Sequence, residues 1–486
     1  MFDFSSHLDI CLSLTKYSPL MDKLGHLPPI PLIINYSDRT RTMTLQDEGN
    51  ICLGLKQHDR VHQVNLQSPS SSFCSWLLQM NQCFSRLVDL SLLSATAEME
   101  EMNLVLPETF QAPNLRRLSL HGIGLPTNLP LLSSAIALST LSLTHIRAYC
   151  YFPPGHLVTQ LKSLPHLEEL SIGFAILPGE LLLTSISPVT LVTLPALRRL
   201  TFRGMDPYLD SLVAQIDTPL LERLTVTLHF DLTFTLVNLT GFIHRIEGLR
   251  LLVARVIFNK GSVSIDAGHN EQQGGGKSSL SGLNINVNCE LLDWQINSAT
   301  QVCGALGKVL STVEDLTVDL RDFGMASDWE STLEDVPWHE LLLPFIGVKK
   351  LHIGSSLTLE LSQALKSSAR FVLQELQELE VSLKIADVTN ALTAFIETRE
   401  SVGRHIRLLV PPEDGEEEAR IRATLAMRRS QRQEPEYRWQ RKVEAEQRKV
   451  EAVREEMEIW KARALALEEL LKGLDIPLPR PLSSGF

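Results

Sequence analysis

Apolar residues recur along the chain in one pattern, apolar-x-x-apolar-x-apolar, with polar residues between them. The stretch NLRRLSLHGIGL, residues 114–125, places Leu115, Leu118 and Leu120 on this pattern. Eight further copies begin at residues 87, 138, 167, 197, 221, 313, 348 and 376, and a weaker copy, VHQVNL, begins at Val61. Alternation with a period of two is typical of a strand with one buried face. Each copy therefore predicts one short strand.

The spacing of the copies indicates a repeat array. Between Leu221 and Val313 the pattern blurs, with candidate units at Leu249 and Leu280, and successive units from Leu87 then lie 23 to 35 residues apart. This length is typical of leucine-rich repeats, which must stack because no unit can bury its apolar face alone. The sequence predicts an α/β leucine-rich-repeat solenoid over residues 30–410, with a curved parallel sheet and convex helices.

Several segments between the expected strands space their apolar residues three and four apart, which predicts the convex helices. These segments are residues 156–164, 233–246, 298–310 and 388–400. Residues 259–282 break the repeat pattern and predict an extra hairpin around Val263 and Ile265, followed by a mobile loop. The GGGKSS run in that loop lacks a phosphate-binding signature, because Glu271 stands where the first glycine is required.

The composition changes near Pro411, after which residues 411–472 form a charge-rich region with helical periodicity. A heptad pattern from residue 443 predicts a two-stranded coiled coil and hence a possible homodimer. A lone surface helix, or a helix that folds back to cap the last repeat, remains open. Residues 473–486 are expected to form a proline-rich, disordered end. The candidate coiled-coil seam comprises Val443, Val450, Val453, Met457, Trp460, Leu467 and Leu471.

Charge and composition narrow the classes of partner. The formal net charge of −12 disfavours attraction to nucleic acid or to an anionic membrane. No apolar run reaches the roughly 20 residues of a membrane span, and the first residues lack the basic region of a signal peptide. Seven cysteines without CxxC spacing indicate reduced thiols. We expect a soluble protein of the cytoplasm or nucleus.

The sequence offers no constellation that predicts catalysis. His58 and His62, beside Asp59, have helical metal-ligand spacing, but they lead into an expected strand, where residues four apart are too distant to share an ion. Nucleophile and metal-protease motifs are absent. We therefore expect no enzyme, and no catalytic, cofactor-binding or metal-binding residues.

The polar residues between the leucines are expected to line the concave surface of the solenoid and to face a protein partner. Those of the first strands are mainly basic or hydroxylated, and those of the last strands are acidic, so a partner would be steered to one orientation. Plain solvated strand faces would carry the same residue types. The candidate partner surface comprises Arg117, Ser119, His121, Glu169, Arg199, Arg203, Arg223, Asp315, Asp319, Glu378 and Glu380.

The repeats LRRLSLHGIGLPTNLPLL, LSTLSLTHI, LPHLEELSIGF, TLPALRRLTFRGMD, LVAQIDTPLLERLTVTL and FIHRIEGLR resemble F-box-type leucine-rich-repeat proteins expanded in mushroom-forming fungi, over roughly residues 5–410. SSHLDICLSL and LPPIPLIINY are similar to the linker that follows the F-box, which assigns residues 1–29 to that linker. In the family, the F-box docks onto the linker subunit of a cullin–RING (SCF-type) ubiquitin ligase and the repeats present a substrate. Residues 1–27 contain no tryptophan and no F-box signature, so ligase docking transfers to no residue here.

Together, the repeats and the resemblance predict a non-catalytic protein–protein recognition module derived from a ubiquitin-ligase substrate receptor. The alternative is a structural scaffold that the coiled coil of the tail oligomerises, with no link to ubiquitination.

Overall fold

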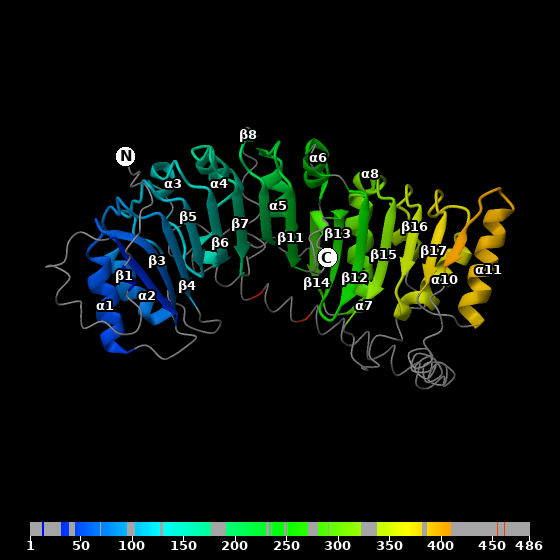
Figure 1. Ribbon diagram of the computed structural model, residues 1–486, viewed down its shortest axis with the longest axis horizontal. Helices are drawn as coiled ribbons and strands as arrows, with labels where there is room; N and C mark the ends of the chain where they lie inside the picture. Colours follow the sequence, from blue (N-terminus) through cyan, green and yellow to red (C-terminus); the bar gives the residue numbers. More distant parts are fainter. Residues whose placement is uncertain are drawn as a thin grey trace, which may run out of the picture.

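One long sheet organises the molecule. The computed structural model describes residues 12–13, 31–37, 44–68, 70–94, 103–126, 130–175, 191–229, 233–234, 236–246, 249, 251–270, 280–289, 291–321, 338–381 and 386–409, with Arg454 and Lys461. Within this part of the chain, sixteen strands lie side by side in one row (Figure 1). In sheet order they are β1 (Leu12–Ser13), β2 (Leu32–Ser37), β3 (Val61–Ser68), β4 (Asp89–Ser94), β5 (Arg117–His121), β6 (Thr140–Ile146), β7 (Glu169–Phe174), β9 (Arg199–Gly204), β11 (Arg223–His229), β14 (Leu280–Asn288), β13 (Ser262–Asn270), β12 (Val253–Asn259), β15 (Asp315–Leu320), β16 (Lys350–Ile353), β17 (Glu378–Val381) and β18 (Arg407–Leu409).

The apolar pattern of the sequence fixes which strands form and how they pair. All nine copies of the pattern, and the weaker copy at Val61, supply a strand. Neighbouring copies pair in parallel and in register, so that Leu90, Leu118, Leu141, Leu170 and Leu200 lie side by side across five strands. Each of these leucines is at most 1% exposed. The predicted α/β architecture with a large, mostly parallel sheet is therefore confirmed.

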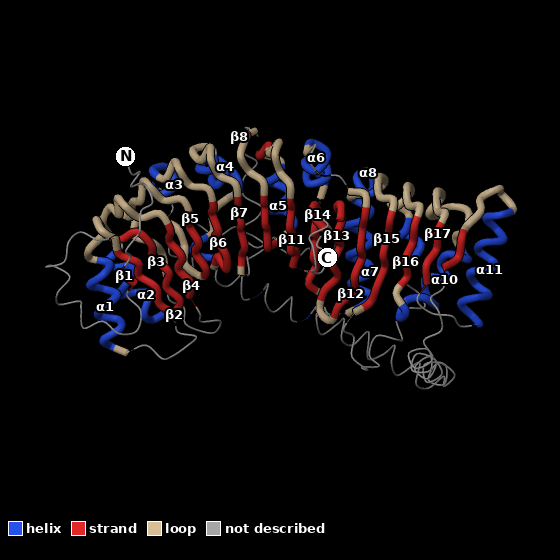
Figure 2. The backbone as a smooth tube through the Cα atoms, viewed as in Figure 1, coloured by secondary structure: helices blue, strands red, loops and turns tan. Residues whose placement is uncertain are grey.

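Helices cover one face of this sheet (Figure 2). Strand residues alternate between buried and solvent-accessible positions, and the buried ones share a single apolar core with the helices. The four segments with helical spacing correspond to α4, α6, α7 with α8, and α11. The helices are α1 (Leu45–Leu55), α2 (Ser70–Gln79), α3 (Pro130–Ser134), α4 (Pro154–Leu161), α5 (Asp206–Val213), α6 (Val237–Arg245), α7 (Leu292–Ala305), α8 (Gly307–Leu310), α9 (Trp338–Leu342), α10 (Thr358–Ser367) and α11 (Ala386–Glu400). A separate two-stranded sheet pairs β8 (Val192–Thr193) with β10 (Ile216–Asp217).

The middle of the sheet departs from the simple order of repeats. After β11 the chain passes two strand positions before it enters the sheet as β12, and then turns back through β13 and β14 to pair with β11. Strand β13 is antiparallel to both neighbours, and its turn from β12 uses Gly261 with φ +87°. The expected hairpin around Val263 and Ile265 thus lies within the main sheet. The unit proposed to start at Leu249 starts at Leu251, because Ala254 is the residue aligned with Leu316.

A buried carboxylate joins the helices on either side of β11. Asp210 of α5 is 7% exposed, and its oxygens accept hydrogen bonds from the backbone N–H groups of Asn238 at 2.8 Å and Leu239 at 3.0 Å. The Asn238 side chain donates a third hydrogen bond at 2.8 Å. These N–H groups lie in the first turn of α6, where a helix has no internal acceptors. Asp210 therefore anchors α6 at the point where the order of the strands changes.

Several sequence-based predictions fall on residues that the structure does not describe. They are the linker-like segment 1–29 apart from Leu12–Ser13, the loop 271–279, and the tail beyond residue 409 apart from Arg454 and Lys461. All seven residues of the candidate seam lie outside the described residues. Among the helices that are described, none is both long and apolar enough to cross a membrane.

Candidate functional site

The sheet face turned away from the helices carries the candidate partner residues. We call it the open face and divide it into an amino half, β4 to β11, and a carboxyl half, β12 to β18. Because the parallel strands pair in register, the amino half has three columns of side chains. The first is Asp89, Arg117, Thr140, Glu169, Arg199 and Arg223, the second is Ser91, Ser119, Ser142, Ser171, Thr201 and Thr225, and the third includes His121, Thr144, Gly173, Arg203 and Thr227.

The second column, which we call the hydroxyl column, consists of serine and threonine on six successive strands. Adjacent strands lie about 4.8 Å apart, so the hydroxyls recur at that interval. In the described part of the chain, none of the six hydroxyl groups has a hydrogen-bond partner within the protein. These groups are therefore free to hydrogen-bond to water or to a bound molecule.

The arginines of the amino half differ in their ionic partners. Arg117 forms an ion pair with Asp89 at 2.8 Å, and Arg199 forms one with Glu169. Arg203 and Arg223 have no ion-pair partner among the described residues. The basic stripe expected from the sequence is thus neutralised at two positions and uncompensated at the other two.

A β-bulge gathers histidines around Arg203 at the end of the third column. The β6–β7 register shifts between Leu143 and Ile146, so that Thr144 and His145 together face Gly173. His145 adopts φ 55°, and its ring stacks on that of His121 with centroids 5.2 Å apart. His121 Nδ1 lies 3.0 Å from Thr144 Oγ1. The sequence signal was the three-residue step from Leu143 to Ile146, which breaks the period of two.

Burial and the cations around these rings favour their neutral form. Burial, followed by His145 and Arg203, lowers the pKa of His121 below its ordinary value of 6.5. Burial, followed by Arg147 and Arg203, lowers the pKa of His145. Burial and Arg203 likewise lower the pKa of His229, against the opposing effect of a hydrogen bond to the Phe174 backbone. The arginine is therefore a shared source of positive potential for three rings from three strands.

In the carboxyl half, the expected acidic residues are matched by bases. Glu378 pairs with Lys350 at 2.8 Å, and Glu380 Oε2 lies 3.5 Å from His352 Nδ1. Burial raises the pKa of Asp315, and the nearby Lys350 and Arg255 oppose that rise. The acidic character expected from the sequence is therefore compensated at Glu378 by Lys350 on the neighbouring strand, whereas Glu380 is compensated only when His352 carries a proton.

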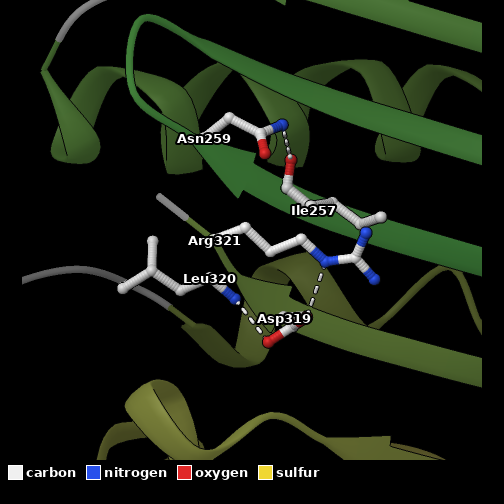
Figure 3. Close-up of polar contacts among 5 residues, drawn as sticks. All are labelled: Ile257, Asn259, Asp319, Leu320 and Arg321. Atoms are coloured by element: carbon white, nitrogen blue, oxygen red, sulfur yellow. Dashed lines mark hydrogen bonds and ion pairs between the residues drawn. The ribbon is translucent and has the colours of Figure 1, made fainter. Parts of the chain in front are cut away.

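Asp319 shows this compensation within one strand end (Figure 3). Its carboxylate accepts hydrogen bonds from the Leu320 backbone N–H at 2.9 Å and from Arg321 Nε at 3.0 Å. On the adjacent strand β12, the Asn259 side chain donates to the Ile257 carbonyl at 3.5 Å. Gly354 allows the Asp319 side chain to sit close, because a Cβ there would meet Asp319 Oδ1 at 2.0 Å. Asp319 is thus fixed by its own neighbours.

The described residues contain no metal-binding cluster, and two of their buried thiols are held in the protonated form. No group of three or more His, Cys, Asp or Glu side chains there could hold a metal ion. His58 Nδ1 lies 3.1 Å from the Cys83 carbonyl oxygen, and His62 belongs to β3. Burial raises the pKa of Cys150 to about 11 and that of Cys303 to about 12, so both stay protonated at neutral pH.

Comparison with known proteins gives no further assignment: no protein-family model matches the chain, and no curated protein matches it. The functional argument therefore rests on the fold and on the geometry of the open face.

Proposed function

We propose that this protein is a non-catalytic recognition module whose open face binds a protein partner. The observation that carries this proposal is the amino half of the open face. It combines a row of unpaired hydroxyls with Arg203 and Arg223, which lack ion-pair partners among the described residues. Exposed, uncompensated charge next to hydrogen-bonding groups favours a partner of complementary charge.

We further propose that the sheet is a leucine-rich-repeat solenoid. Support comes from the repeat spacing, from the in-register leucine columns and from helices that cover one face only. Such arrays hold their strand side chains at fixed intervals, so a partner meets a preorganised surface and ordering it on binding costs little.

The resemblance to F-box-type repeat proteins extends the proposal to descent from ubiquitin-ligase substrate receptors. On this view the open face holds the substrate, whereas contact with the ligase needs a separate segment. Purification of the full chain with its partners, followed by mass spectrometry, tests the link. Recovery of the cullin–RING linker subunit would support descent with a retained ligase function. If other stable partners are recovered without that subunit, a retained ligase function is contradicted.

The recognition proposal itself is tested by capture of partners on the two faces of the molecule. A full chain with Arg199, Arg203 and Arg223 all changed to alanine should lose the partners that the unchanged chain retains, and their binding should become less sensitive to salt. The control carries Lys162→Ala and Lys366→Ala, two exposed lysines of the helical side. Equal retention by both variants would contradict binding at the open face.

A chain without residues 413–486 distinguishes recognition from scaffolding. The recognition module should keep its partner without the tail, because the repeats alone supply the open face. Loss of both assembly and partner would instead favour a scaffold oligomerised by the tail.

A further inference from the structure

The bulge at the end of β6 brings together a cluster of polar side chains. Binding of a partner to the open face does not by itself need this cluster. His121 comes from β5, Thr144 and His145 from β6, Arg203 from β9 and His229 from β11. Five polar side chains from four strands thus form one group. Together with burial, the charge of Arg203 lowers the pKa values of all three histidine rings. We call this group the histidine–arginine cluster.

Backbone strain at His145 indicates that the cluster is built rather than incidental. A residue other than glycine with φ 55° is uncommon and carries an energetic cost. Without the bulge, the alternation of β6 would direct residue 145 toward the core. The extra residue instead carries the ring outward, where it stacks on His121 at an interplanar angle of 18°. Bulges commonly re-aim a side chain in this way.

Gly173 lies at the centre of the cluster and is itself buried. It stands on β7 between Thr144 and Arg203, and a Cβ at this position would lie 3.6 Å from both residues. Such a side chain would fit without a clash, so packing alone does not demand glycine here. Arg203, on the neighbouring strand, is exposed.

Among the described residues, no carboxylate contributes to the potential at the three rings. The charged groups that affect the histidine pKa values are Arg203 and Arg147, both cationic, and no carboxylate is among them. Arg203 has no ion-pair partner within the described residues. His229 Nε2 is buried without a hydrogen-bond partner in the described structure. An anionic group would supply the missing charge.

We infer that the histidine–arginine cluster is a carboxylate-binding site, which takes an aspartate or glutamate side chain from an acidic segment of the partner. This inference deepens the proposed function and rests on it. At neutral pH the rings are mainly uncharged, so the cluster offers the single guanidinium charge of Arg203, which suits a singly charged carboxylate better than a phosphate dianion.

The same arrangement makes binding dependent on pH. As the pH falls below 6.5, His121, His145 and His229 gain protons, and each added charge attracts the anion, while burial and the charge of Arg203 oppose the protonation. A bound carboxylate offsets that opposition and must raise the pKa of the rings in return, since the coupling is reciprocal. Affinity should therefore increase from pH 7.5 to pH 5.5, where glutamate remains ionised.

A labelled hexaglutamate peptide and the full chain test this inference directly. Arg203→Gln should weaken peptide binding about tenfold, which is the loss expected for one charge-assisted hydrogen bond. Arg116→Gln is the matched control, because it removes an exposed arginine that precedes β5 and lies outside the cluster. The double variant His121→Asn/His145→Asn should remove most of the gain at pH 5.5. Histidine NMR of the unchanged chain should show higher ring pKa values with the peptide bound.

Three outcomes would overturn the inference. Equal weakening by Arg203→Gln and Arg116→Gln would indicate general attraction, and absence of hexaglutamate binding between pH 5.5 and 7.5 would exclude the site. Displacement of the peptide by inorganic phosphate at far lower concentration than by acetate would assign the site to phosphate. The outcome for the proposed function is separate. If the open face captures partners equally well with and without Arg203, recognition by the open face stands and only the carboxylate site is refuted.

Discussion

The two halves of the open face share one backbone geometry and differ in how their charges are compensated. In the carboxyl half Glu378, Glu380 and Asp319 each contact a basic residue. In the amino half Arg203 and Arg223 lack such a partner among the described residues, and a hydroxyl column runs between them. Residue type alone suggested a basic region and an acidic region of similar strength. Pairing between strands leaves uncompensated arginines in the amino half.

The largest expected effect on stability comes from a charge placed in a buried column, compared with the same charge placed on the open face. Leu200→Asp places an unpaired charge in the core of β9, where Leu200 is 1% exposed, and should cost about 4 kcal/mol or abolish cooperative unfolding. Thr201→Asp, one residue on and exposed, should change the free energy of unfolding by less than about 1 kcal/mol. Urea denaturation measures both, and similar losses would contradict the assignment of the two faces.

Asp210 tests the junction between the halves. Asp210→Ala removes three hydrogen bonds to the start of α6 and should lower the free energy of unfolding by about 2 kcal/mol. Asp210→Asn keeps acceptor oxygen and should recover part of that loss. Hydrogen exchange should show faster opening of α6 in the alanine variant. Unchanged exchange there would argue that α6 is held by apolar packing alone.

The histidines of the amino half predict how stability depends on pH. Their pKa values in the folded chain lie below the unfolded value of 6.5, so the unfolded chain binds protons first. Their contribution is complete above pH 6.5 and is lost as the pH falls through the lower folded values. Urea denaturation at pH 7.5 and 5.5 should show a smaller decrease for His121→Asn/His145→Asn than for the unchanged chain. An equal decrease would mean that other groups dominate.

The smallest effect is expected in the carboxyl half. The pair Lys350–Glu378 is exposed to solvent, with side chains 60% and 30% accessible. Water and salt screen such pairs, so Lys350→Gln/Glu378→Gln should leave the urea midpoint within experimental error of the unchanged chain. A clear shift in midpoint would show that the ion pairs of this half stabilise the fold and do not merely neutralise its surface.

Local patterns predicted most of the fold, whereas pairing between distant segments set the remainder. The spacing of Leu115, Leu118 and Leu120 was sufficient to place a strand, because period two and burial are local properties. The order β14, β13, β12 was not accessible, since Leu283 and Ala254 each offer an apolar strand residue and only the three-dimensional pairing decides between them. A strand can pair with any compatible neighbour, so its period does not reveal its partner.

For the candidate site, too, the sequence predicted local features but not the pairing between distant segments. The open-face positions of Arg199 and Glu378 followed from alternation, but their ionic partners, Glu169 and Lys350, stand on strands more than twenty residues away. His145 was missed because it faces the solvent only through the bulge. Regular alternation would have placed it toward the core, and the change of step before Ile146 was the one local sign.

The central claim is that recognition belongs to the amino half of the open face. Quantitative capture of partners by two full-length variants tests it most directly: Arg203→Ala/Arg223→Ala in the amino half and Glu378→Gln/Glu380→Gln in the carboxyl half. The account predicts that the first variant loses most of the captured partner and that the second retains it. Retention by the first variant with loss by the second would contradict the account.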